Sequence, residues 1–162
     1  LIMTVNKPQT IYRSIVTIHL IISILTTLII GIVYTIRKNQ PIPSDQNLII
    51  FEFIIPLTVI SSFIFSHYIS KRKLGSIYKQ MPLAEKLFVF KEVKIIQWVS
   101  LFGSVILATV SFLISAQQNL LLYAMMIGVM ILYYRPVKNR VGEDLDLTSE
   151  ELELLTSSND NI

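Results

Sequence analysis

The chain has 162 residues, of which 52% are hydrophobic and only 15% are charged. A water-soluble domain of this size usually carries about 25% charged residues, so the composition argues against one. Cysteine is absent, which excludes disulfide bonds, thiolate catalysis and cysteine-bound iron–sulfur clusters.

Four long apolar segments account for the low charge, and they cover 11–36, 48–70, 95–115 and 118–134. At 1.5 Å per residue, the first is long enough to cross a hydrocarbon layer of about 30 Å. It is too long for the apolar part of a cleaved signal peptide, and no small-residue cleavage pattern follows it. The fourth is short, but it ends in Tyr133, Tyr134 and Arg135, which is typical of a membrane-interface anchor. The sequence therefore predicts an all-α integral membrane four-helix bundle.

The connection 71–94 between the second and third segments contains its own helical signal. Pro82 suits the first position of a helix, and Leu83, Leu87 and Phe90 then recur on one face. An amphipathic pattern of this kind is typical of a helix that lies in the membrane interface. We therefore expect a short interfacial helix at 82–94, ahead of the third span.

Lysine and arginine are divided unequally between the two sides that four crossings define. Twelve lie on the N-terminal flank, in 71–94 or just after the fourth span, and only Arg37 and Lys38 lie on the other side. Because cytoplasmic loops are enriched in these residues, both termini are predicted to be cytoplasmic. The same distribution explains the net charge of +3 as membrane-flanking charge, without nucleic acid as a partner.

The last segment, 141–162, carries seven carboxylates and no lysine or arginine. It is predicted to be an acidic cytoplasmic tail beside a transmembrane domain of 1–140. Thr148 and Glu151 have the spacing of a capping box, which predicts a short helix from about 149.

The connection 71–94 has a net charge of +5 and begins with a basic patch, Lys71, Arg72 and Lys73. Three alternatives stay open for these opposite charges. The tail folds back onto the connection, the connection binds anionic lipid while the tail recruits another protein, or the tail is simply solvated.

Glu52 and Pro56 lie inside the second span and form a candidate ion or proton site. Pro56 cannot donate a hydrogen bond to the carbonyl of residue 52 and is expected to kink the helix. A free carbonyl beside a carboxylate suits a cation or a proton. The alternative is that Glu52 reaches the outer boundary, towards Arg37 or Lys38.

His19 and His67 are the two histidines, and both lie in predicted spans. If the first two helices pack as an antiparallel hairpin, the histidines reach a similar depth and are candidates to bind a b-type haem or a metal. However, His67 is rotated well away from the polar stripe of its own helix. It also lies one turn from Lys71, where an interfacial histidine is ordinary.

Small residues recur every four positions on the last two spans, at Ser100, Ser104 and Ala108 and at Ala124 and Gly128. This spacing lets membrane helices approach closely, and serine hydroxyls can bond across the contact. We expect helix packing there, and a water-filled path is the alternative.

The motifs of enzyme chemistry are missing from this sequence. It has no glycine-rich phosphate loop, no HExxH pattern and no paired carboxylates within a span. This argues against hydrolysis, although redox and transport roles are less dependent on such motifs.

The end of the chain resembles that of a group of small proteins. From Arg135 it runs Arg-Pro-Val-Lys-Asn-Arg-Val-Gly-Glu-Asp-Leu-Asp-Leu-Thr-Ser-Glu-Glu. This stretch and 83–97 are similar to uncharacterised small four-span proteins of Bacteroidetes-type bacteria. The resemblance covers the C-terminal half, implies a bacterial inner (cytoplasmic) membrane and brings no catalytic residues.

The sequence favours a non-enzymatic subunit or scaffold, assembled with itself or with a larger membrane complex. A haem-binding or metal-binding redox subunit that uses His19 and His67 is the first alternative. Conduction of protons or cations at Glu52 is the second.

Overall fold

The computed structural model describes residues 7–40, 49–77 and 80–155, and within them the side chains of residues 49, 50 and 52 lie outside the description. This part of the chain forms helices and no strands, which confirms the all-α prediction. The helices are α1 (Pro8–Lys38), α2 (Ile49–Leu74), α3 (Leu83–Ser115), α4 (Gln118–Tyr133), α5 (Lys138–Leu145) and α6 (Ser149–Leu154).

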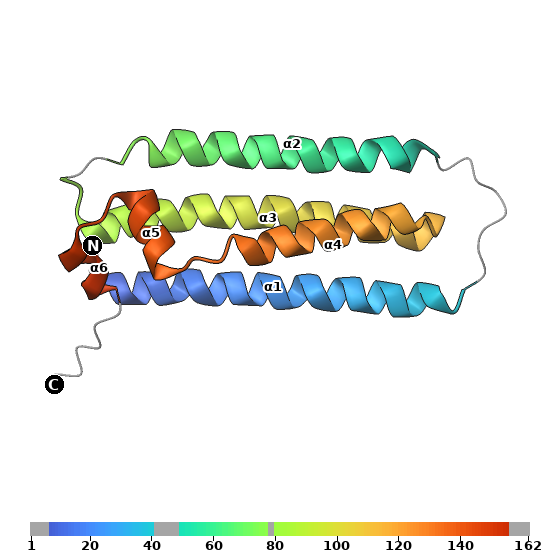
Figure 1. The fold of residues 1–162 in the computed structure, drawn as a ribbon, viewed down its shortest axis with the longest axis horizontal. Coiled ribbons are helices and arrows are strands. Elements are labelled where there is room, and N and C mark those ends of the chain that lie inside the picture. The colour runs from blue at the N-terminus through green and yellow to red at the C-terminus, as the bar shows by residue number, and fades with distance from the viewer. Residues whose placement is uncertain (1–6, 41–48, 78–79, 156–162) are drawn as a thin grey trace, which may run out of the picture.

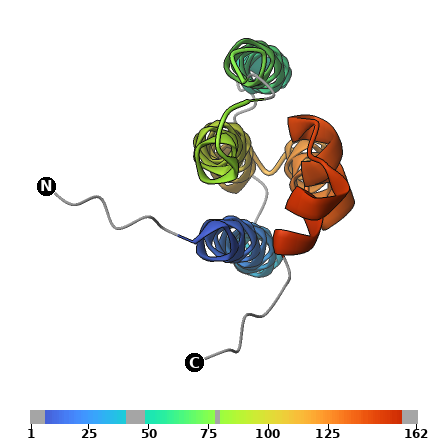
Figure 2. The ribbon, with the colours of Figure 1, turned by 90° about the vertical axis from the view of Figure 1, so that its left-hand side faces the viewer.

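The four long helices run side by side, with α3 at the centre (Figure 1). In the end view of Figure 2, α1 and α2 lie on opposite sides of α3, and α4 lies beside α3 and α1. The contacts agree, because α3 packs extensively on α1, α2 and α4, whereas α1 and α2 hardly touch each other. The condition on which a pairing of His19 with His67 depended, direct packing of α1 on α2, is therefore not met. The ten residues between Lys38 and Ile49 can span about 33 Å, which is enough to let one helix lie between two others.

The bundle has two distinct ends. The tail end holds the start of α1, the end of α2, the start of α3 and both short helices, α5 and α6 (Figure 1). The turn end holds the end of α1 and the turn from α3 to α4. At this turn Ala116 adopts a left-handed conformation with a φ of 58°, and its N–H donates to the carbonyl of Phe112 at 2.8 Å. That bond ends α3 and lets α4 start at Gln118.

The third long helix corrects one expectation. Helix α3 runs without a break from Leu83 to Ser115, so 82–94 is not a separate interfacial helix. The apolar face that contains Leu87 and Phe90 continues along the same side into Trp98 and Leu101, and all four side chains are buried. Because no glycine or proline interrupts the helix between them, the predicted interfacial segment is the first third of α3.

Helix α4 is only 16 residues long, about 24 Å at 1.5 Å per residue. The chain then bends by 80° into α5. At this bend Arg140 lies over the ring of Tyr133, 4.4 Å from its centre, and donates to the Tyr133 carbonyl at 2.6 Å. Pro136 in the connection cannot supply an N–H to continue the helix.

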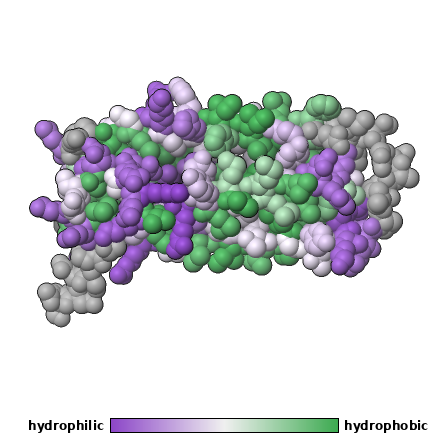
Figure 3. Space-filling view, viewed as in Figure 1, coloured by the Kyte–Doolittle hydropathy of each residue, from purple (hydrophilic) through white to green (hydrophobic). Residues whose placement is uncertain are grey.

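The surface of the bundle is strongly apolar in its middle. On the face that Figure 3 shows, hydrophobic residues gather over the middle of the long helices and polar residues gather towards both ends. In the described part of the chain, α1, α2 and α3 are each long and apolar enough to cross a membrane, and α4 with α5 makes a fourth if the bent pair counts as one span. The chain is thus all-helical with three or four helices that could span a bilayer.

Candidate functional site

At the tail end, the two short helices α5 and α6 pack onto α3 and α1. Val141, Leu145 and Leu155 are buried. They join a core that α1 and α3 supply with five further buried side chains: Ile11, Ile15, Leu87, Phe90 and Trp98. The acidic tail is therefore docked on the bundle as far as Leu155, and of the three alternatives the structure matches the fold-back.

A buried lysine of α3 forms an ion pair with the docked tail. The side chain of Lys86 is only 2% exposed, and its Nζ lies 3.0 Å from Oε1 and 3.4 Å from Oε2 of Glu151. A buried ammonium group without a carboxylate would be strongly unfavourable. The contact therefore fixes α6 on the first turns of α3.

Glu151 also completes the predicted capping box. Its Oε2 accepts from the backbone N–H of Thr148 at 3.0 Å, and its own N–H donates to Oγ1 of Thr148 at 3.2 Å. Partial burial alone would raise the pKa of the Glu151 carboxyl. The hydrogen bond from the Thr148 N–H and the hydrogen bond and charge of Lys86 outweigh burial and hold that pKa below its ordinary value.

A second ion pair links α5 to α3, at a position further along α3 than Lys86. Nζ of Lys94 lies 3.1 Å from a carboxylate oxygen of Asp144 and 4.9 Å from the centre of the Phe90 ring. Gly142 lies where α5 meets α6, and a Cβ atom at that position would come within 2.6 Å of a Leu152 methyl group. The two short helices therefore approach each other closely, and both are tied to α3.

His19 is buried at the junction of α1, α3 and α4. Its Nε2 lies 2.9 Å from the carbonyl oxygen of Ile131, and its ring meets Trp98 edge-on at 5.0 Å. In a continuing helix the N–H of Arg135 would bond to the Ile131 carbonyl, but it bonds to Leu132 instead. His19 thus donates to a carbonyl left free where α4 ends.

His67 does not meet His19. It is exposed on α2, and α2 lies across α3 from α1 (Figure 2). The structure therefore does not bring the two proposed haem ligands together within one chain. The hydrogen bond from His19 to Ile131 also gives that imidazole a structural partner.

The proposed ion site lies in α2. The helix continues through Pro56 from Ile49 to Leu74. The Glu52 side chain lies outside the described residues, so the pairing of Glu52 with a cation stays a hypothesis.

The predicted packing residues lie along α3 and α4. Ser104 is buried and its Oγ bonds to Oγ of Ser62 on α2 at 3.0 Å. Ala108 and Ala124 are fully buried, and Ser100 is half-buried. A Cβ at Gly128 would lie 3.4 Å from side-chain atoms of α1, so α4 approaches α1 closely at this glycine.

The basic patch Lys71, Arg72 and Lys73 forms the last turn of α2. Lys73 pairs with Glu92 of α3 at 3.1 Å, while Lys71 and Arg72 are exposed. Most of the charge of this patch therefore faces outwards at the tail end.

Two buried cations were missed by sequence reasoning. The helical pattern of 83–94 assigned Lys86 to the polar side, and the available signal was the opposite charge of the tail. Arg37 was assigned to the membrane boundary, yet it is only 8% exposed. Charge at a helix end is so common beside membrane spans that its burial leaves no mark in the sequence.

No group of three or more His, Asp or Glu side chains that could hold a metal ion occurs within the described ranges. Fold and site together define a helical chain with apolar helices of membrane-spanning length and a docked acidic tail. No family model, curated protein or solved structure matches this chain.

Proposed function

We propose that the chain is a multi-pass integral membrane protein that crosses the bilayer four times, with both termini in the cytoplasm. The twelve-to-two division of lysine and arginine supports this orientation. It puts the tail end, with α5 and α6, on the cytoplasmic side. The C-terminal resemblance noted above supports a bacterial inner membrane.

The short fourth helix fits such a crossing. Unpaired backbone groups are costly in lipid, and α4 ends below the usual length of a span. His19 supplies the Ile131 carbonyl with a donor from α1, so the chain can leave the helix within the bundle. The first third of α3 and the docked tail then project beyond the bilayer on the same side.

We further propose that the protein is a non-enzymatic subunit that associates with a second copy of itself through α1. The observation that carries this proposal is an exposed face on which Thr27, Gly31 and Thr35 follow each other at four-residue spacing. A Cβ atom at Gly31 would meet nothing within 4 Å. The face borders a hollow of about 410 Å³, lined also by Leu28, Ile32 and Ile36.

The chemistry of this face suits helix association in lipid. The Thr27 hydroxyl donates to the carbonyl of Ser23 at 3.0 Å, and the Thr35 hydroxyl to that of Gly31 at 2.8 Å. Neither threonine therefore exposes an unmet donor. In a membrane, apolar surface alone does not drive association, whereas small residues that let backbones approach closely do.

The experiment compares Gly31→Leu with a matched control, Gly103→Leu, in detergent and in bilayers. Gly103 is also an exposed glycine with nothing within 4 Å of its Cβ position, but bulky Val99 and Leu107 stand four residues to either side. Wild type and Gly103→Leu are expected to give an oligomer mass by light scattering and energy transfer between labelled copies in liposomes. Gly31→Leu is expected to be monomeric.

A monomeric wild type in both media would contradict self-association. So would a Gly31→Leu protein that associates as strongly as the control. The pure wild type could instead be monomeric and co-purify with another membrane protein that only Gly31→Leu loses. That result would show that the face binds a different partner and not a second copy.

A further inference from the structure

The turn end holds a buried cation for which the described part of the chain supplies no carboxylate. Arg37, in the last turn of α1, is 8% exposed. Its Nη1 donates to Oε1 of Gln40 at 2.9 Å, whereas Nε and Nη2 are buried and have no hydrogen-bond partner in the described part of the chain. Two guanidinium nitrogens thus lack an acceptor among the described residues.

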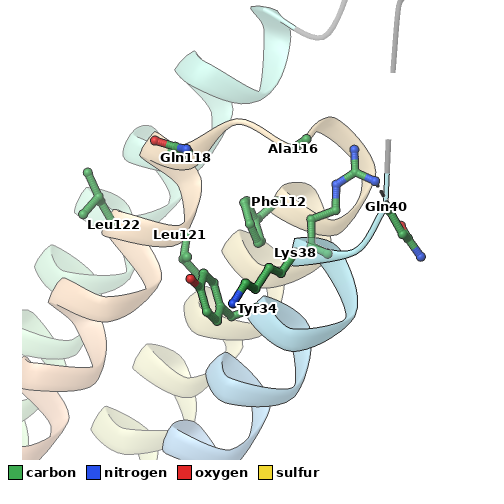
Figure 4. A pocket seen from close by; sticks show the side chains of 9 residues that line it. Tyr34, Lys38, Gln40, Phe112, Ala116, Gln118, Leu121 and Leu122 are labelled. Atoms are coloured by element: carbon green, nitrogen blue, oxygen red, sulfur yellow. Dashed lines mark hydrogen bonds between the residues drawn. The ribbon is translucent and has the colours of Figure 1, made fainter. Parts of the chain in front are cut away.

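Arg37 is one of the residues that line a hollow of about 540 Å³ between the end of α1 and the turn from α3 to α4. Figure 4 shows Lys38 and Tyr34 reaching side by side beneath that turn, close to Phe112 and Leu121. Among the described residues, the lining includes two cations, Arg37 and Lys38, and no carboxylate, and Phe112, Leu121 and Leu122 contribute apolar side chains.

The position of Arg37 is only partly explained by its helix. A positive charge at a helix C-terminus is stabilised by the helix dipole, and this accounts for a basic residue in the last turn. It does not account for two buried N–H groups without acceptors, which cost free energy until an acceptor is supplied. The planar guanidinium presents these donors in a fork that matches two oxygens of one phosphate or carboxylate group.

We propose that this hollow binds a phosphate-type anion, held by Arg37 with Lys38 and Tyr34 as further donors. The anion is either the phosphate of a membrane lipid or a free phosphate. The apolar lining from Leu121 and Leu122 lies beside the polar donors, as the first carbons of a lipid would require. This site is separate from the α1 association face and does not depend on oligomer formation.

The test measures binding by the full chain in a neutral maltoside detergent, with three probes: phosphatidylglycerol, phosphatidylcholine and inorganic phosphate. Binding is followed by native mass spectrometry for lipids and by the shift in unfolding temperature for all three. Arg37→Gln is compared with Arg72→Gln, which removes the same charge from an exposed position at the tail end. Wild type and Arg72→Gln are expected to bind equally, and Arg37→Gln about tenfold or more weakly, because charged hydrogen bonds are lost.

The probes distinguish the source of the anion. Preference for phosphatidylglycerol over both other probes supports a lipid ligand, and saturable binding of inorganic phosphate supports a free anion. No saturable binding by wild type would overturn the proposal, and so would equal weakening in Arg37→Gln and Arg72→Gln, which would indicate adsorption to net charge. Should Arg37→Gln fail to fold, exposed Lys38 provides a second variant, and unchanged affinity in Lys38→Gln would overturn the site.

Asp45 follows in the sequence and lies outside the described residues. An Asp45→Asn protein tests whether the chain's own carboxylate is the acceptor. If phosphate binds only to the Asp45→Asn protein, the acceptor of Arg37 in the wild type is Asp45, and the proposal of an anion site is overturned.

Discussion

Two buried cations at opposite ends of the bundle, Lys86 and Arg37, differ in the partners that surround them. At the tail end, Lys86 meets a carboxylate of the docked tail, 65 residues further along the chain. At the turn end, Arg37 lines a hollow and has one amide partner, and two of its nitrogens have no partner in the part of the chain that the structure describes. The charge of Lys86 is neutralised by Glu151 of the same chain. Arg37 leaves room for an acceptor from outside the chain, so we interpret the tail end as structural and the turn end as a binding site.

The largest expected effect comes from removing the carboxylate at the tail end. Glu151→Ala leaves Lys86 buried without a partner and breaks the capping box at Thr148. Loss of one member of a buried pair costs about 3 kcal/mol, so we expect a fall of that size in the free energy of unfolding, together with earlier proteolysis of the tail. Unfolding by denaturant in mixed micelles gives the first quantity, and limited proteolysis the second.

Glu150→Ala is the matched control for this change. Glu150 is the neighbouring carboxylate in the first turn of α6 and is exposed, so its loss should change stability by less than about 0.5 kcal/mol. Replacement of both partners, in Lys86→Met with Glu151→Leu, is expected to recover most of the stability because no buried charge remains. Equal effects of Glu150→Ala and Glu151→Ala would remove the distinction between the two ends.

The next effect concerns the two histidines. His19→Leu leaves the Ile131 carbonyl without a donor and should cost about 2 kcal/mol of stability. His67→Leu changes an exposed side chain and should cost less than about 0.5 kcal/mol. Both are measured by the same unfolding experiment. A haem absorption band that is present in wild type and lost in both variants would contradict the structural role of His19.

The sequence was sufficient for some of these features and insufficient for others, for physical reasons. Helix type and approximate ends follow from long apolar segments bounded by basic residues, and the capping box at Thr148 and Glu151 was confirmed because its chemistry is local. The order of helices around α3 depends on packing between distant segments, which one sequence does not display. That is why His19 and His67 were paired in the sequence but lie apart in the structure.

The short helix α5 illustrates the same limit within one segment. Gly142 lies in its interior, and glycine there costs about 1 kcal/mol relative to alanine, so local propensity argued against a helix. Val141 and Leu145 bury their side chains against α1 and α3, and this tertiary contact outweighs the local cost. Whether the acidic tail docks or is solvated stayed open in the sequence for a related reason, since its few apolar residues are outnumbered by carboxylates.

The smallest effect expected is the acid sensitivity of the tail. The pKa of Glu151 in the folded chain lies below its ordinary value of 4.5, so its ionised form favours the docked tail. This contribution is fully present above about pH 4.5 and is lost as the pH falls through the lower, folded-state pKa. Protonation removes the negative charge of Glu151 beside Lys86 but keeps the side chain in place, so the loss of stability should be smaller than in Glu151→Ala.

Proteolysis of the tail at pH values from 7 to 3, with an acid-stable protease, should show release of the tail at the lowest pH values in wild type and a weaker pH response in Glu151→Gln. If the two proteins release their tails along the same curve, Glu151 is not the group that couples docking to pH, and docking of the tail depends on its apolar contacts alone.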